Sequence, residues 1–400
     1  MIGKIIQTII VIAVSTVAFL VIYYSEPKQP SHQKASEASE HLPVSPVKPS
    51  SNPPPSSIPS QETAPSVEKP PQHLSQTVTE EHKAPVQHTD IITVPHNPDQ
   101  PIHVGILGEG QSVEAKNEGF NSTVLRQLFE VFKKRKVDAI FFTGDLVSGA
   151  LIGKDNESHH SSIDILKEQL DKFSSILTNE LGSKIPFFPA LGSSEISILK
   201  KHSEIFFNHF HLDDGVYFKN HTFAYGVSIG SAFFAVIPSD AYNPEKQGIE
   251  AVFDQEMQKW LKDTLEKASK THKYIFVIGH EPAFPTTSAF VGERILRERD
   301  AFWQILGDNG VIAYFASHER LYDRSYRRGE WQVISGGAGA PITEGESGKP
   351  FYHALILTIP VESELGAQID VVDVKGEIID SLELRRIQFP LYQYHISKRD

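Results

Sequence analysis

The sequence predicts an α/β layered domain that follows a long non-globular leader, and three observations support this fold class. Between residues 101 and 270, apolar runs of strand length alternate with amphipathic helical patterns. After residue 270 the strand-length runs continue without a long helix, which predicts a second, more antiparallel sheet stacked on the first. The first hundred residues, in contrast, contain one long apolar run and then a stretch rich in proline and serine.

The apolar run near the amino terminus extends from Ile5 to Tyr24 and is about long enough, as a helix, to cross a bilayer. We therefore expect residues 1–24 to form a single membrane anchor. A cleaved signal peptide is the alternative, although no small-x-small cleavage site precedes Glu26. Lys4 and the terminal amine favour a cytoplasmic amino terminus, so the rest of the chain is expected on the extracytoplasmic side of the membrane.

Residues 25–100 consist mostly of Pro, Ser, Gln, Glu, Lys and His and contain few large apolar side chains. Such a composition cannot bury a core, so we expect a disordered linker. A flexible chain of this length reaches on the order of 50 Å, enough to hold a domain clear of a membrane. Pro-x-x-Pro patterns such as Pro27 to Pro30 leave open a second role as a recognition tract, whose protein partner the sequence does not identify.

The remaining residues, 101–400, are expected to form one domain. Short apolar runs predict strands at 104–107, 139–143, 187–191, 232–237, 274–278, 311–315, 331–335, 354–359 and 367–372. Helices are expected at 121–136, 163–181 and 252–268. In the first and last of these, apolar residues recur every three or four positions and share one face: Val124, Leu125, Leu128, Phe129 and Phe132, and then Phe253, Met257, Trp260, Leu261 and Leu265.

Charge and cysteine content exclude several classes of function. The chain has 400 residues, a formal net charge of -12 and no cysteine. Nucleic-acid-binding surfaces need clustered Lys and Arg, and the basic run from Lys133 to Lys136 is explained by its place at the end of a helix. We therefore expect no nucleic-acid partner. Without cysteine there is no disulfide or thiolate ligand, so any metal must be held by His, carboxylate or amide groups.

Polar residues capable of catalysis or metal binding follow five successive predicted strands. They are Glu109, Asp145, the pair Ser193 and Ser194, His280 and His318. Each alone has an ordinary explanation, such as a helix cap, a solvated carboxylate or a hydrogen-bonded core histidine. Their joint placement is harder to explain in that way, because α/β folds gather catalytic groups in the loops after their strands.

The motifs around these residues, in this order, resemble those of the calcineurin-like metallophosphoesterases. The segment 142–149 is similar to the family's Gly-Asp motif, whose carboxylate, here Asp145, bridges two metals. The segment around His280 resembles the family's isolated metal-binding histidine, and 315–324 resembles its Gly-His-x-His segment, with His318 as the first histidine. The stretch 333–341 and the helix that contains 255–261 also fit. The resemblance implies a double β-sandwich flanked by helices and the hydrolysis of phosphoesters at a two-metal site.

The first motif departs from the family pattern. Where most members carry Asp-x-His, this chain has Glu109 and Gln111. Glu109 then stands in for the aspartate. Asn121 is a candidate oxygen ligand in place of the missing histidine, and its alternative role is the N-cap of the helix that follows.

Two further motifs are also altered. Ser193 and Ser194 occupy the positions of the family's amide ligand and catalytic histidine, and Arg320 replaces the last metal-binding histidine. Arginine cannot ligate a metal. It can instead hold a phosphoryl oxygen, or it can pair with a nearby carboxylate such as Glu109 or Glu195.

The altered motifs imply one divalent ion per chain in place of two. Asp145, His280 and His318 supply one carboxylate and two imidazoles, which suffice for an open zinc, manganese or iron site. Glu109 and Asn121 are the remaining candidate ligands of the other metal position. Ser194 leaves no acid for the leaving group, and no base is evident that would activate it as a nucleophile.

Two classes of function stay open at this point. The first is a metal-dependent phosphoester hydrolase with an incomplete, one-metal site and a phosphoester or another anion as ligand. The second is a catalytically inactive domain of the same fold that serves as a binding or scaffold module tethered to the membrane.

Overall fold

The computed structural model describes residues 91–112, 118–149, 159–196, 201–212, 215–217, 223–243, 248–251, 253–286, 298–345, 347–362 and 366–385. The predicted anchor, residues 1–24, and nearly all of the predicted linker, residues 25–100, lie outside these ranges. Within the ranges, no helix is long and apolar enough to cross a membrane.

The larger of two main sheets has eight strands. Its order is β1, β6, β7, β10, β11, β13 and β12, and β5 pairs with β6 beside this path. The central strands β7, β10, β11 and β13 run parallel to one another. The strand bounds are β1 (Ile91–Val94), β5 (Val216–Tyr217), β6 (Phe223–Ile229), β7 (Ala232–Val236), β10 (Tyr274–Ile278), β11 (Ala313–Ala316), β12 (Tyr322–Arg327) and β13 (Glu330–Ser335).

The second sheet has six strands in the order β16, β15, β14, β2, β3 and β4. Its first half is antiparallel, and β2, β3 and β4 are parallel. The bounds are β2 (Ile102–Leu107), β3 (Ala139–Phe142), β4 (Phe187–Pro189), β14 (His353–Ile359), β15 (Ala367–Asp373) and β16 (Ile378–Leu384). A separate ribbon consists of β8 (Asp240–Asn243) and β9 (Gly248–Ala251).

The two sheets face each other across a core rich in aromatic residues. The ring of Phe141 on β3 stacks on that of Phe234 on β7, with centroids 4.4 Å apart. Successive residues of β7 alternate between this core and a second one, because Phe233 points to the opposite face of the strand. A strand buried on both faces has no polar alternation, as the all-buried β7 confirms.

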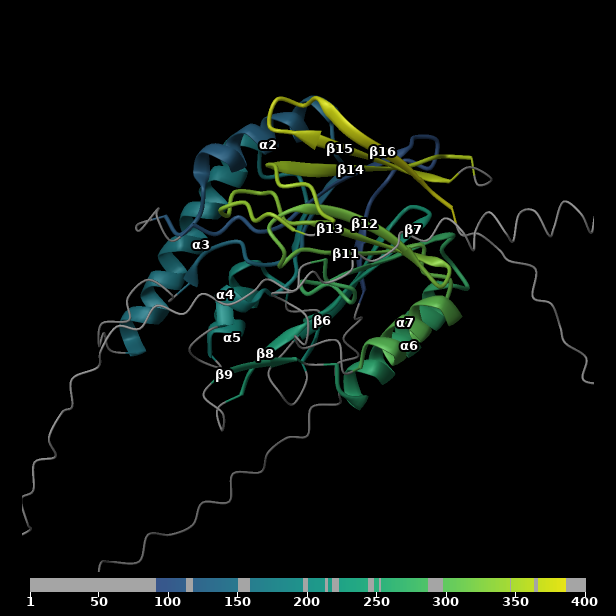
Figure 1. The fold of residues 1–400 in the computed structure, drawn as a ribbon, viewed down its shortest axis with the longest axis horizontal. Helices are drawn as coiled ribbons and strands as arrows, with labels where there is room; N and C mark the ends of the chain where they lie inside the picture. Colours follow the sequence, from purple (N-terminus) through teal and green to yellow (C-terminus); the bar gives the residue numbers. More distant parts are fainter. Residues whose placement is uncertain are drawn as a thin grey trace, which may run out of the picture. The chain divides into compact units, whose positions relative to one another are not determined.

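Helices cover the outer faces of both sheets (Figure 1). On one side, α2 places Phe132 against Gly105 of β2, and α3 places Phe173 against Phe142 of β3. On the other side, the second core packs Met257 of α6 against the larger sheet, together with α7. The helix bounds are α2 (Ser122–Arg135), α3 (His159–Leu181), α4 (Ser193–Ile196), α5 (Lys201–His209), α6 (Gln255–Ala268) and α7 (Arg299–Asp308). The predicted mixed α/β architecture with two sheets and flanking helices is confirmed.

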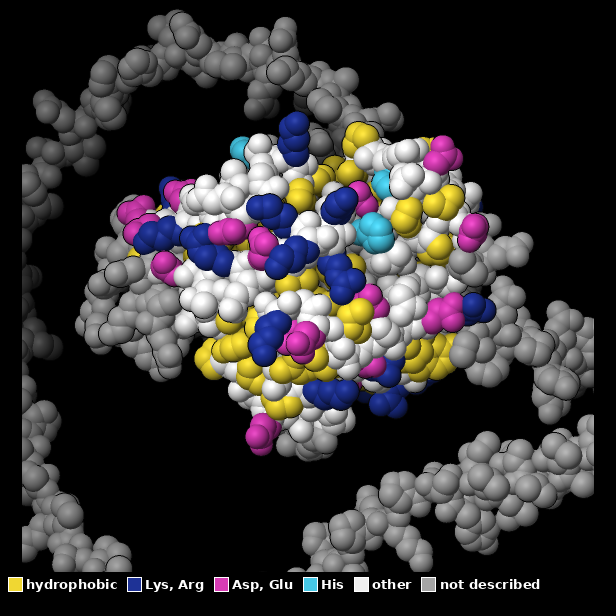
Figure 2. Space-filling view, turned by 90° about the horizontal axis from the view of Figure 1, so that it is seen from above, with side chains coloured by type: hydrophobic (Ala, Val, Ile, Leu, Met, Phe, Trp, Pro, Cys, Tyr) yellow, Lys and Arg dark blue, Asp and Glu magenta, His cyan; other side chains and the backbone are white. Residues whose placement is uncertain are grey.

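Two details of the prediction require correction. The late strands do not form one antiparallel sheet of their own, because β10, β11 and β13 join the larger sheet in parallel while β14 and β15 join the smaller one. The expected boundary of the folded domain at residue 101 is ten residues too late, since β1 pairs with β6 from Ile91 to Val94. On the face drawn in Figure 2, basic and acidic side chains lie interspersed over this domain.

Candidate functional site

The residues predicted at strand ends come together where the parallel strands of both sheets end. Glu109 follows β2 and Asp145 follows β3 in the smaller sheet, whereas His280 follows β10 and His318 follows β11 in the larger one. Neighbouring parallel strands end at the same edge of a sheet, so the two stacked sheets deliver four ligand-type residues to one place. Ser194 joins them from α4, the short helix after β4.

The backbone at this site adopts conformations that non-glycine residues rarely take. Glu109, Asp145 and His318 have φ values of 63°, 56° and 63°, all in the left-handed region. Each such residue carries a conformational cost, and clusters of them are found at functional sites. Here the neighbouring backbone enforces the conformation: Gly110 and Gln111 both donate N–H groups to the carbonyl oxygen of Asp145, at 2.9 and 3.2 Å.

The His280 ring is fixed so that one nitrogen can bind a cation. Its Nδ1 lies 3.0 Å from the carbonyl oxygen of Thr143, and the Ser317 hydroxyl donates to the same oxygen at 2.7 Å. Because a carbonyl only accepts, Nδ1 carries a proton, which leaves Nε2 as the nitrogen that can bind a metal. That Nε2 lies 3.5 Å from Asp145 Oδ1 and 3.1 Å from His318 Nδ1. A Cβ on Gly144 would lie 2.6 Å from the ring, so this close approach requires glycine.

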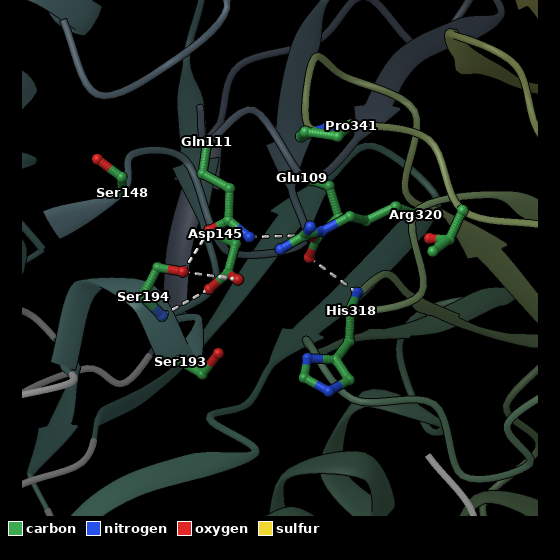
Figure 3. Close-up of a pocket in the computed structure, with 10 residues that line it drawn as sticks. Glu109, Gln111, Asp145, Ser148, Ser193, Ser194, His318, Arg320 and Pro341 are labelled. Carbon is green, nitrogen blue, oxygen red and sulfur yellow. Dashed lines mark hydrogen bonds and ion pairs between the residues drawn. The ribbon is translucent and has the colours of Figure 1, made fainter. Parts of the chain in front are cut away.

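Asp145 is oriented by Ser194 of α4. The Ser194 N–H donates to Oδ1 at 2.8 Å, and its hydroxyl lies 2.9 Å from Oδ2 and also contacts Oε1 of Gln111 (Figure 3). Burial by itself would raise the pKa of Asp145, but the two histidines and the Ser194 donors hold that pKa below its ordinary value. Asp145 is therefore a buried, ionised carboxylate.

Glu109 is equally buried, and three donors surround its carboxylate. The His318 N–H donates to Oε1 at 3.0 Å, and Gln111 Nε2 donates to Oε2 at 3.1 Å. Arg320 Nε lies 3.4 Å from the same Oε2. Burial and the negative charge of Asp145 nevertheless raise the pKa of Glu109 well above its ordinary value. A cation beside this pair of carboxylates would oppose the shift, because it favours the ionised form.

The donor set fits one divalent ion. Ligand atoms of Glu109, Asp145 and His280 all lie within 4.8 Å of one another, and all three residues are buried. Two carboxylates and one imidazole are a set that zinc, manganese and iron accept. His318 lies beside this triad through its contact with His280. Of the predicted set Asp145, His280 and His318, this group contains the first two, and its third member is Glu109, which the prediction had assigned to the other metal position.

A pocket of about 320 Å³ opens onto the carboxylates. It is lined by charged or polar side chains from five loops together with one proline (Figure 3). Arg320 is the cationic residue in this lining, and its side chain is 38% exposed. The other lining residues are Glu109, Gln111, Asp145, Ser148, Ser193, Ser194, His318, Pro341 and Thr343.

The contacts of Asn121 and Arg320 show which of their alternative roles each has in this structure. Asn121 does not line the pocket: its Oδ1 accepts from the N–H of Val124 and its Nδ2 donates to the carbonyl oxygen of Gly339. It is the N-cap of α2, and its oxygen is committed to that role. Arg320 pairs with Glu109, as one of the two alternatives expected.

Sequence reasoning missed the supporting role of Glu195, which is fully buried. Its carboxylate accepts the backbone N–H groups of Gly192, Asp145 and Val147 at 3.0, 3.2 and 3.1 Å. Burial and the charge of Asp145 raise the pKa of Glu195 to about 8. The sequence offered one signal for this role, because Glu195 is an acidic residue directly after Ser194 at the same strand end. Gln111, which bridges Glu109 and Ser194, carried no such signal.

Comparisons with known proteins agree with this geometry. A sequence profile of the calcineurin-like phosphoesterases matches residues 90–320, more than half of the chain. A purple acid phosphatase from yellow lupin (Lupinus luteus) seeds is 14% identical with a TM-score of 0.52, and the match covers 72% of this chain and 54% of that one. A dimetal phosphatase from Danio rerio is 12% identical with a TM-score of 0.53, covering 72% of this chain and 100% of that one.

The match therefore spans about half of the length of the lupin enzyme. No curated protein matches the sequence. The likeness to the two solved structures supports the fold, and the profile match covers the strand ends that carry Glu109, Asp145, His280 and His318. The chain belongs to the calcineurin-like phosphoesterase family.

Proposed function

We propose that this protein is a phosphoester hydrolase that works with one divalent ion held by Glu109, Asp145 and His280, with His318 beside them. The observation that carries the proposal is the buried convergence of these three ligand groups within 4.8 Å. When bound, the ion would polarise a phosphoryl oxygen and lower the pKa of a coordinated water. Zinc, manganese and iron all suit the donor set.

The chain's own residues supply orientation and charge. The Thr143 carbonyl keeps Nε2 of His280 directed at Asp145, and Ser194 fixes the plane of the Asp145 carboxylate. Arg320 lines the pocket and is the group suited to hold a phosphoryl oxygen through its planar, permanently charged guanidinium. A metal and a guanidinium would then share the phosphoryl charge that two metals share in intact family members.

Substrate preference follows from the residue at position 194. A serine hydroxyl is too weak an acid to protonate an alkoxide that leaves from phosphorus. Ser194 is also occupied with Asp145 and Gln111. Aryl phosphates, whose leaving groups depart without a proton, are therefore the preferred substrates of this proposal.

A second candidate function is a catalytically inactive binding or scaffold module. One observation favours it: donors of the chain itself already satisfy both acidic side chains, since Ser194 holds Asp145 while Gln111 and Arg320 hold Glu109. Such a network needs no metal to be stable. In either case we propose that residues 1–24 anchor the domain to a membrane and that the linker places it on the extracytoplasmic side, as the amino-terminal sequence suggests.

Metal content and hydrolysis, measured on the same preparation, test the proposal. The full-length protein is purified beside an Asp145→Asn, His280→Ala double variant and a matched control, Asp164→Asn, His272→Ala, in which both substitutions lie outside the site. Elemental mass spectrometry gives the metal per chain, and aryl phosphate mono- and diesters give the activity. A one-metal hydrolase is supported if the wild type contains about one metal per chain and hydrolyses the esters, and if only the site variant loses both properties. If the wild type holds no metal and hydrolyses the esters no faster than the site variant, even with excess manganese or zinc, the hydrolase is ruled out in favour of the tethered binding module.

A further inference from the structure

Glu109 is the ligand in the triad that already has a cationic partner. Its other two donors, the backbone N–H of His318 and the amide of Gln111, are neutral. The guanidinium of Arg320 is the charged donor to this carboxylate. A carboxylate that is 1% exposed needs such a partner, because burying an unpaired charge is strongly unfavourable.

The Arg320 backbone is fixed, whereas its side chain has room to move. The carbonyl oxygen of Arg320 accepts the N–H of Thr343 at 3.1 Å, which ties its loop to the neighbouring loop of the pocket lining. The side chain is 38% exposed and its Nε contact with Glu109 is long, at 3.4 Å. Figure 3 shows the side chain reaching from its loop toward Glu109 along the pocket. The guanidinium can therefore leave the carboxylate without any change in the backbone.

We propose that Arg320 is the counter-ion of Glu109 in the metal-free protein, and that a divalent ion displaces it into the pocket, where it binds the phosphoryl group of the substrate. This inference rests on the proposed metal site. Two cations on one buried carboxylate repel each other, so the ion pair and the metal compete. Once displaced, the guanidinium lies free in a pocket lined by Ser193 and Thr343, whose hydroxyls suit a phosphoryl group.

Displacement of Arg320 would make the metal and the phosphoryl ligand bind cooperatively. Arg320 lowers the affinity for the metal while the pocket is empty, because the ion pair must first be broken. A phosphoryl ligand gives the displaced guanidinium a new partner and so restores metal affinity. By linkage, the metal must increase phosphate affinity by the same factor.

Calorimetric titration with Mn²⁺ of the full-length protein, with and without inorganic phosphate, tests this coupling. In the absence of phosphate, Arg320→Gln is expected to bind Mn²⁺ roughly tenfold more tightly than the wild type, a change within the range of typical coupling between sites. In the wild type, phosphate is expected to increase Mn²⁺ affinity at least about fivefold, and in Arg320→Gln this increase is expected to be several-fold smaller, because only the direct contact between phosphate and metal remains. Arg320→Lys, which keeps the charge without the planar fork, should retain the weaker metal affinity. Arg126→Gln, which removes an arginine from an exposed ion pair with Glu180, serves as the control.

Each outcome decides between the two proposals. Equal Mn²⁺ affinity in the wild type and Arg320→Gln, with or without phosphate, overturns the counter-ion role and leaves the metal site intact. If only Arg320→Gln binds Mn²⁺, the counter-ion role is supported, but the wild-type protein is not a metal-dependent enzyme. Binding by neither protein overturns both. Thermal unfolding without metal provides a further readout, because Arg320→Gln should lower the Tm of the metal-free protein and Arg126→Gln should not.

Discussion

Glu109 gives the site its expected pH dependence. Burial and the charge of Asp145 raise the pKa of Glu109, so a proton competes with the metal for this carboxyl up to a higher pH than for an ordinary glutamate. Metal affinity should therefore rise with pH, by up to about tenfold per unit below the raised pKa when one proton is released. Mn²⁺ titrations from pH 5.5 to 8, in buffers of different ionisation enthalpy, measure both the affinity and the proton release. In Glu109→Gln the affinity should be lower and its pH dependence shallower; an equally steep dependence there would assign the proton to another group.

Glu195 is expected to matter for stability more than for ligand contact. Three backbone N–H groups donate to its carboxylate, and two of them belong to the loop that holds Asp145 in the left-handed conformation. Glu195→Ala leaves these buried donors without an acceptor, which should lower the free energy of unfolding by at least about 3 kcal/mol. Urea denaturation measures the loss. Glu168→Ala, which removes an exposed partner of Lys172, should change it by less than about 0.5 kcal/mol, and equal losses would contradict the anchoring role.

At this scale the sequence predicts which residues meet at the site but does not predict their contacts. Asp145, His280 and His318 were identified because each follows an apolar strand, and strand ends gather in α/β folds. The contact of Ser194 with Gln111 joins residues 83 positions apart, and no local pattern encodes it. Asn121 was ambiguous for a physical reason, since an amide after a strand and before a helix serves equally well as ligand or N-cap.

Among the elements, most interior strands are predicted from the sequence, although β6 is missed, and of the four edge strands of the two main sheets only β4 is predicted. Strands β2, β3, β7 and β10 are buried on both faces and read as continuous apolar runs. Strands β1, β12 and β16 were missed, and all three lie at sheet edges. Edge strands carry polar and charged residues that discourage further pairing, which removes the apolar signal from their sequence.

Two of these edge strands are joined across the sandwich by one carboxylate. Asp380 on β16 accepts from the Tyr322 hydroxyl at 2.9 Å and lies 3.2 Å from Nε of Arg324, and both partners are on β12. Asp380→Ala should lower the free energy of unfolding by about 2 kcal/mol, because the buried Tyr322 hydroxyl loses its acceptor. Hydrogen exchange should then accelerate first in the amides of β16. Glu266→Ala on α6, which removes the exposed partner of Lys270, is the control, and an equal acceleration in both variants would contradict a clasp between the sheets.

For the whole molecule, both sheets must be assembled before the site exists. Glu109 and Asp145 come from the smaller sheet, and His280 and His318 come from the larger one. A ligand that binds only the assembled sandwich stabilises it by mass action, by about 2.7 kcal/mol at a hundredfold excess over Kd. The proposed metal would therefore hold the two sheets together as well as serve the chemistry.

The boundary of the folded unit is a prediction at the same scale. Strand β1 pairs with β6 and buries Val94, so a fragment that begins at residue 101 exposes an edge of the larger sheet. A fragment of residues 88–385 should unfold at a higher urea concentration than one of residues 101–385. The loss of strand β1 should lower the free energy of unfolding by about 2 kcal/mol. Equal midpoints would show that β1 is dispensable and would restore the boundary that the linker composition suggested.

The left-handed backbone at Glu109, Asp145 and His318 also bears on how the chain can diverge. Glycine adopts this conformation without steric cost, so at these positions the loss of a functional side chain comes with relief of backbone strain. In a descendant that no longer needed the ligands, drift toward glycine would meet little resistance there. Glycine at positions 109, 145 and 318 in related sequences would thus indicate that the site has lost its function, and sequence comparison alone would show this.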